Sequence, residues 1–277
     1  MTFEYGKPPH GMAFGDQRLF PSDDSAWGES WQPPEPDATA TLWRYMSFAK
    51  FCSLLERQQL FFALVSDMAD KFEGFISPPT SRKLGDIVER AERIGWIFLR
   101  EITQNALINC WTEADHESSL MWTSYANAEG VAIRTTFQDL QASLFSIAPT
   151  LPVTFGKVAY VDHRLKELRR FSHAPLFQKR VEYRGEEEVR ATLPSPPWEV
   201  RLDLENPNET NVLITLDSDV AKQRGRYISV DLNALVKEVV LHPHSEAWFG
   251  RLVQSVVDRS PINTHVAPSA LDERGWH

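Results

Sequence analysis

Short runs of apolar residues, some alternating with polar ones, occur at several points along the first half of the chain. Such runs, bounded by turn signals, are typical of strands. They predict strands of a central sheet at Leu42–Tyr45, Leu60–Val65, Asn109–Trp111 and Val131–Arg134. Apolar positions recur at helical spacing in 47–59, 83–106 and 116–127, and these segments are predicted to be helices. In the last of them we expect Met121 and Trp122 to be buried.

The second half of the chain is richer in predicted strands, which lie at 155–162, 187–193, 211–217 and 225–232. A basic helix is expected at 163–171, and helical segments flank a strand between 233 and 259. Because strands and helices do not alternate strictly, the pattern favours an α+β fold with a mixed central sheet flanked by helices over a doubly wound parallel sheet. Residues 1–40 are rich in Pro, Gly, Asp and Ser and predict an extended arm, which leaves 41–277 as a single α+β domain.

Composition narrows the class of protein. The 277 residues are 42% hydrophobic and 24% charged, which is enough apolar sequence for a large core. A net charge of -9 disfavours general binding to nucleic acid or acidic membranes, although a local basic groove stays open. Cys52 and Cys110 form no CxxC motif, and the sequence has no predicted membrane span, so we expect a cytoplasmic protein without a disulfide framework or zinc site.

The segment Lys179–Arg190, KRVEYRGEEEVR, concentrates acids and bases. In a strand, Glu186, Glu188 and Arg190 would project to one face, so that two carboxylates lie close together. Paired carboxylates can act as a general base or stabilise a developing cation. The same cluster is also typical of a solvated surface whose charges pair with one another. Lys179, Arg180 and Arg190 could therefore neutralise the glutamates or bind a phosphate-bearing ligand.

Several segments together resemble the bacterial domain of unknown function 2971. The resemblance covers about Leu42 to Ser269, and the motifs occur in the order and roughly at the spacing of that family. They are LWRYMSFAKF, DKFEG, NCW, HES with MW, YANAEGVAI, GKVAYVD and KRVEYRGEEEVRA. The family implies no settled activity.

A more distant resemblance is to the ADP-ribosyltransferase fold, whose enzymes carry an Arg or His on an early strand, a Ser or Thr motif on a middle strand and a late Glu-x-Glu. Arg44 corresponds to the first element and Glu186-x-Glu188 to the third. Ser66, Thr135 and Thr136 are candidates for the middle element, but none lies in a Ser-Thr-Ser motif. The resemblance implies NAD as substrate, no metal, and a nucleic-acid or protein acceptor.

In that reading each residue has a chemical role. Glu188 would stabilise positive charge on the ribose, and Glu186 would orient or deprotonate the acceptor. Arg44 would bind the pyrophosphate as a bidentate donor. Aromatic faces for nicotinamide or a base would come from Tyr45, Trp111, Trp122 and Tyr125, residue types that are more often found in a core. One cleft holding both Arg44 and Glu188 would support this enzyme, whereas opposite faces would count against it.

The sequence thus predicts an ADP-ribosyltransferase-like or related nucleotide-handling enzyme of a bacterial defence or toxin system. One alternative is a non-enzymatic protein-interaction module, in which the charge cluster is structural. Another is a metal-dependent nuclease, with Asp67, Asp70 and Glu73 as candidate oxygen ligands, although their spacing lacks the glycine turn of a calcium loop.

Overall fold

The computed structural model describes residues 33–74, 103–162, 174–194 and 224–272, and the backbone of 198–203 and 211–216. The predicted helix at 163–171 lies outside these residues, as do most of the predicted arm and nearly all of the predicted helix at 83–106. Among the described residues, no helix is long and apolar enough to cross a membrane.

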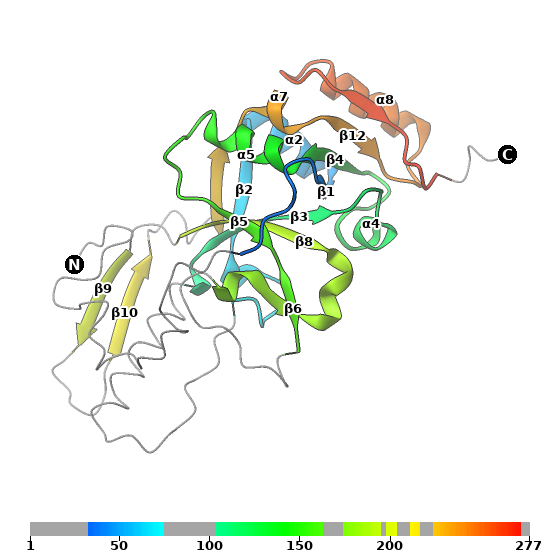
Figure 1. Cartoon of the computed structure of the whole chain (residues 1–277). Helices are drawn as coiled ribbons and strands as arrows, with labels where there is room; N and C mark the ends of the chain where they lie inside the picture. The colour runs from blue at the N-terminus through cyan, green and yellow to red at the C-terminus, as the bar shows by residue number, and fades with distance from the viewer. Residues whose placement is uncertain are drawn as a thin grey trace.

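A mixed, mainly antiparallel sheet occupies the centre of the described molecule (Figure 1). Its strands run in the order β11, β2, β3, β1, β4, β12, β13; β8 also pairs with β3, and β5 pairs with β8. The α+β class and the four strands expected in the first half of the chain are confirmed. The bounds are β1 (Thr41–Ser47), β2 (Gln59–Leu64), β3 (Leu107–Glu113), β4 (Gly130–Thr136), β5 (Thr154–Lys157), β8 (Glu188–Leu193), β11 (Gly225–Ser229), β12 (Glu238–Leu241) and β13 (His265–Ala267).

Within the residues that the structure describes, two pairs of strands lie outside this sheet. β6 (Ala159–Val161) pairs in parallel with β7 (Gln178–Arg180), and β9 (Trp198–Asp203) pairs antiparallel with β10 (Asn211–Leu216). The first pair matters for the site, because β7 carries Lys179 and Arg180, and the side chain of Lys179 contacts Glu188 of β8.

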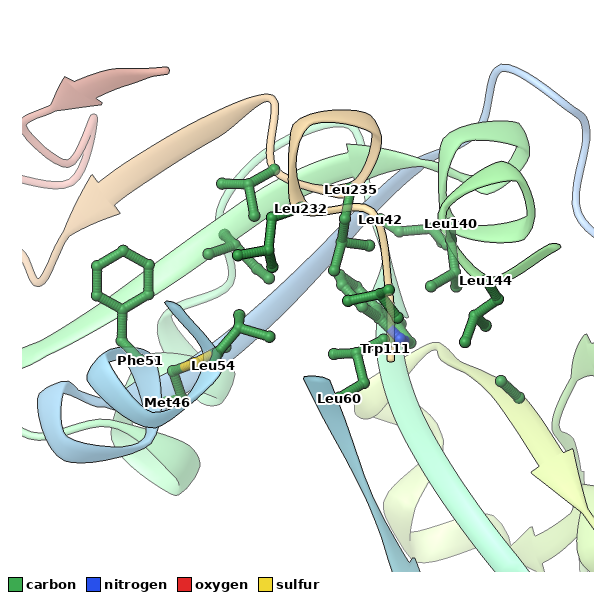
Figure 2. Close-up of a cluster of buried hydrophobic side chains, with 14 of the residues drawn as sticks. Leu42, Met46, Phe51, Leu54, Leu60, Trp111, Leu140, Leu144, Leu232 and Leu235 are labelled. Carbon is green, nitrogen blue, oxygen red and sulfur yellow. The ribbon is translucent and has the colours of Figure 1, made fainter. Parts of the chain in front are cut away.

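One face of the central sheet, here called the helix face, holds the main apolar core (Figure 2). Leu42 and Met46 of β1 project to it with Trp111 of β3, and four helices cover it. These helices are α2 (Phe48–Arg57), α5 (Phe137–Phe145), α7 (Leu232–Leu235) and α8 (Ala247–Val257). Their buried leucines, phenylalanines and valines, among them Leu54 and Leu140, pack against the strands, so this face is closed by hydrophobic burial.

The opposite face, here called the charged face, has a different covering. Next to β1 it is apolar, because Trp43 and Tyr45 pack under α4 (Ser119–Tyr125), whose Met121 and Trp122 are buried as predicted. Next to β3 and β8 it is covered by η1 (Val65–Asp67), η2 (Ala174–Phe177) and η3 (Val181–Glu186). There it contains ionised side chains, Glu188 and Arg190 among them.

The sheet forks at β3. β8 pairs with β3 along one edge, so β1 and β2 must share the other, and they reach it at opposite ends. β2 pairs there only through Ala63 and Leu64, whereas β1 pairs only through Leu42 and Trp43. Between these pairings β1 and β2 diverge, and Arg44 is the first residue of β1 beyond its pairing with β3.

Candidate functional site

Two buried bases on the charged face hold three carboxylates. The ammonium Nζ of Lys179 lies 2.7 Å from Glu186 Oε2, 3.1 Å from Glu188 Oε2 and 3.2 Å from Glu73 Oε1. The guanidinium of Arg190 donates to both oxygens of Glu188, at 2.8 and 3.0 Å, and to Glu73 Oε2 at 2.8 Å. It also donates to the carbonyl oxygen of Leu176. We call these five charged side chains the carboxylate cluster; their formal charges sum to one net negative charge.

The shape of the backbone at Glu187 brings two of these carboxylates together. Glu188 and Arg190 share a face through strand alternation, as predicted. The prediction that Glu186 belongs to the same strand is wrong, because β8 begins at Glu188 and Glu186 ends η3. Glu187 between them adopts a left-handed conformation with φ 42° and ψ 54°. Such a conformation is uncommon for a residue with a side chain, and it turns Glu186 back toward Lys179.

The third carboxylate, Glu73, was not predicted as part of this cluster. The sequence suggested it only as a metal ligand with Asp67 and Asp70, although DKFEG was among the motifs that carried the family resemblance. In the structure each acid pairs with a base: Asp67 with Arg224, Asp70 with Arg180, and Glu73 with Lys179 and Arg190. Among the described residues, no three His, Cys, Asp or Glu side chains are placed to hold a metal ion.

Gly74 allows the chain to place Glu73 here. Its φ is 61°, a region that disfavours residues with side chains. A Cβ at this position would lie 2.8 Å from side-chain carbons of both Thr103 and Val65. Glycine is therefore needed directly after Glu73 for steric as well as conformational reasons.

Electrostatics keep Glu188, Lys179 and Arg190 ionised. Burial alone would raise the pKa of Glu188, which is 5% exposed, but the charge and hydrogen bonds of Arg190 and the charge of Lys179 outweigh burial and lower it to about 2. Burial would likewise lower the pKa of Lys179, and the charges of Glu188 and Glu73 raise it instead. Burial would also lower the pKa of Arg190, but the charges of Glu188 and Glu73 raise it well above its ordinary value. The bases predicted for phosphate binding are thus committed to carboxylates, and Arg180 is committed to Asp70.

Glu186 is the carboxylate at the accessible edge of the cluster. Its side chain is more exposed than those of Glu73 and Glu188, at 13% against 3% and 4%. The hydroxyl of Tyr125 donates to Glu186 Oε1 at 3.3 Å, and Tyr125 is about half exposed beside it. Burial and the charge of Glu186 raise the pKa of Tyr125. A ligand approaching the cluster from this edge would therefore meet Glu186 and Tyr125.

Arg44 lies on the other side of the sheet. The pairing of β1 with β3 and of β3 with β8 aligns Trp43, Thr112 and Glu188 in one row, so that Arg44 points toward the helix face. No hydrogen bond or ion pair joins Arg44 to Glu188 among the described residues. The single cleft that the ADP-ribosyltransferase resemblance predicted for these two residues is not formed, because the residues differ in strand parity.

The environment of Arg44 is nevertheless unusual. Its guanidinium lies 5.7 Å from the ring centre of Trp111, and its buried Nη1 has no hydrogen-bond partner in the described part of the chain. Burial lowers the pKa of Arg44 to about 10, with a smaller opposing effect from Cys110. The thiol of Cys110 in turn interacts with Glu188. Cys110 thus interacts both with Arg44, whose Nη1 has no partner among the described residues, and with Glu188 of the carboxylate cluster.

The remaining predicted aromatic residues are mostly packed. Trp111 belongs to the core of the helix face, and its indole N–H donates to Asn109. Tyr45 and Trp122 meet edge to face on the charged face, where the indole of Trp122 donates to Glu117. Of the four predicted stacking residues, three are buried and Tyr125 is about half exposed.

The candidates for the middle Ser or Thr motif do not reach the carboxylate cluster through any described contact. Ser66 lies in η1, Thr135 is buried on the helix face, and Thr136 caps α5 by accepting from the amide of Asp139. In the register row it is Thr112 that lies beside Glu188, and its buried hydroxyl has no partner among the described residues. The sequence alone could not have placed Thr112 beside Glu188, because this placement depends on how β3 pairs with β8.

Comparison with known proteins adds distant structural similarity. No family model matches the chain, and no curated protein is similar to it. Among solved structures, it is similar to Thermus sp. 2.9 DarT in complex with NAD+, with 10% identity, a TM-score of 0.36, and coverage of 84% of this chain and 96% of that one. DarT in complex with ADP-ribosylated ssDNA gives 9% identity and a TM-score of 0.38, covering 87% of this chain and 99% of that one. Similarities of this size establish neither a family nor an activity.

Proposed function

We propose that the chain is an ADP-ribosyltransferase-like or related nucleotide-handling enzyme, with NAD as substrate and the accessible edge of the carboxylate cluster as its reaction centre. The observation that carries the proposal is the convergence of three carboxylates on two buried bases, with Glu186 at the exposed side. A role in a bacterial defence or toxin system belongs to the same proposal.

The charge of the cluster suits cleavage of the bond between nicotinamide and ribose. As that bond breaks, positive charge develops on the ribose, and a fixed carboxylate next to it lowers the barrier without having to reorganise. The cluster carries one more negative charge than positive. Glu186 would face the ribose. The oxygens of Glu188 are held by Arg190 and Lys179, so Glu188 would supply a fixed negative charge behind Glu186. The exposed ring of Tyr125 would contact nicotinamide or the acceptor.

The position of Arg44 counts against the arrangement that the ADP-ribosyltransferase resemblance implies, in which Arg44 and Glu188 share one cleft. A pyrophosphate clamp at Arg44 would have to reach the ribose site past Cys110, through the fork between β1 and β2. Nη1 of Arg44 has no partner in the described part of the chain, and this supports an anionic ligand at the fork, because a buried charged donor without an acceptor is energetically unfavourable. The proposal therefore rests on the carboxylate cluster and does not require Arg44.

A second candidate function is a non-enzymatic protein-interaction module. It is favoured by the completeness of pairing in the cluster, where Lys179 meets three carboxylates and Arg190 meets two carboxylates and a carbonyl. In this case the cluster only holds segment 65–74, β7 and β8 together. The metal-dependent nuclease has less support, because each of its candidate ligands is paired with a base.

Release of nicotinamide from NAD by the purified chain tests the proposal. We expect turnover by the parent protein and a loss of at least about a hundredfold in kcat for Glu186→Gln, which removes the charge at the accessible edge and keeps the shape. Glu182→Gln, in the exposed first turn of the same η3 segment, is the matched control and should keep the parent rate. Glu188→Gln should lose both turnover and stability. No turnover by the parent protein, or full turnover by Glu186→Gln, would reject this assignment.

A further inference from the structure

The three carboxylates of the cluster are not held equally. Arg190 contacts Glu188 through both carboxylate oxygens and Glu73 through one, and Arg190 is itself fixed by the carbonyl of Leu176. Glu186 receives nothing from Arg190. Its described partners are Lys179, at 2.7 Å, and the hydroxyl of Tyr125, at 3.3 Å.

Lys179 is well placed to transmit the position of the fixed carboxylates to Glu186. An ammonium group has three N–H donors, and three carboxylates surround Nζ within 3.2 Å. Its stem is constrained as well, because Lys179 lies on β7, its side chain is 8% exposed, and Nζ sits 4.9 Å from the ring centre of Tyr183. The location of Nζ is thus set by the buried pair, Glu73 and Glu188.

We propose that Lys179 is a positioning residue that fixes η3 and the carboxylate of Glu186 relative to the buried part of the cluster. This inference rests on the proposed function for its catalytic consequence, but its structural part stands without it. Glu188 keeps its place through Arg190 when Lys179 is lost, whereas Glu186 keeps only the weaker contact to an exposed tyrosine. Removing Lys179 therefore loosens the Glu186 end of η3, although Tyr183 of η3 still accepts from Arg180, and leaves β8 in place.

Amide hydrogen exchange on the full chain separates this role from general stabilisation. In Lys179→Met we expect exchange in η3 (Val181–Glu186) to rise about tenfold, because a charged hydrogen bond that closes this segment is gone. Exchange in β8 (Glu188–Leu193) should stay near that of the parent protein. Lys157→Met is the matched control: it removes the partly exposed ion pair between Lys157 of β5 and Glu113 of β3, and should leave η3 unchanged.

Glu186→Ala cuts the same contact from the accessible side and keeps the test valid if Lys179→Met fails to fold. It should raise exchange in η3 as Lys179→Met does. Equal increases in η3 and β8 would show that Lys179 only stabilises the fold, and unchanged exchange in η3 would show that Lys179 does not hold it; either result overturns the proposal.

Kinetics test the catalytic consequence separately. If the parent protein releases nicotinamide, Lys179→Met should lower kcat about tenfold or more and change KM for NAD little, because a displaced carboxylate weakens stabilisation of the transition state more than binding. An equal rise in KM with unchanged kcat would contradict the positioning role. If the parent protein shows no turnover, the proposed function fails, and the exchange experiment still decides whether Lys179 holds η3.

Discussion

The helix face and the charged face of the central sheet use the same strands but are stabilised by different forces. On β3, Trp111 packs into an apolar core, while the neighbouring Cys110 and Thr112 face ionised side chains. Apolar packing tolerates many side chains of suitable volume. A buried ionic cluster tolerates few changes, because the loss of one partner leaves an uncompensated charge. The charged face should therefore tolerate fewer substitutions than the helix face, where hydrophobic burial alone stabilises the fold.

The largest expected effect comes from removing the guanidinium at the centre of the cluster. Arg190→Met leaves Glu73 and Glu188 buried with Lys179 alone, and we expect the free energy of unfolding to fall by ~3–5 kcal/mol. Chemical denaturation measures this loss. Arg134→Met is the control, since its pair with Glu238 is about half exposed and should contribute less than ~1 kcal/mol. Equal, small losses in both variants would mean that the carboxylate cluster contributes no more to the free energy of unfolding than an exposed ion pair does.

A core substitution on the helix face should come next in size. Leu140→Ala removes a fully buried side chain from α5 and should lower the free energy of unfolding by ~3 kcal/mol through lost burial and a residual cavity. This loss should be the same in low and high salt, because no charge is involved. A salt-dependent loss would contradict the division between the two faces.

A further effect, of similar size to that of Leu140→Ala, concerns acid. The pKa of Glu188 is lowered in the folded state, from 4.5 to about 2, so its contribution to stability is complete above about pH 4.5 and is lost as pH falls toward 2. The stability of the parent protein should therefore decline across this window, and that of Glu188→Gln should decline less steeply. Denaturation midpoints measured at several pH values from 6 to 2 would check this. Identical slopes would show that Glu188 is not held ionised by its partners.

Much of the fold could be predicted because strand and helix periods are local properties of the sequence. The runs around Leu42, Leu60 and Val131 predicted the correct strands, and Met121 and Trp122 of α4 are buried as expected. The segment 83–106 remains a prediction, since it lies almost entirely outside the described residues. Local patterns sufficed where a residue's neighbours in sequence determine its environment.

The candidate site could be predicted only in part. The cluster of charges in 179–190 was visible, but Glu73 was not assigned to it, because its partners lie more than a hundred residues away along the chain. The parity of Arg44 relative to Glu188 depends on how β1, β3 and β8 align, which no local pattern encodes. The left-handed Glu187 was missed because glycine, the usual residue in that conformation, is absent there.

The ion pairs of segment 65–74 bear on the order in which this chain can fold. Asp67 bonds to Arg224 across 157 positions, Asp70 to Arg180 across 110, and Glu73 to Arg190 across 117. Contacts of such long range form late, since closing a large loop costs entropy before any pairing repays it. During synthesis, the three acids remain without their bases until most of the chain has left the ribosome. A shortened chain that ends before Arg224 would leave Asp67 without its described partner, so the cooperativity of folding depends on the later part of the sequence.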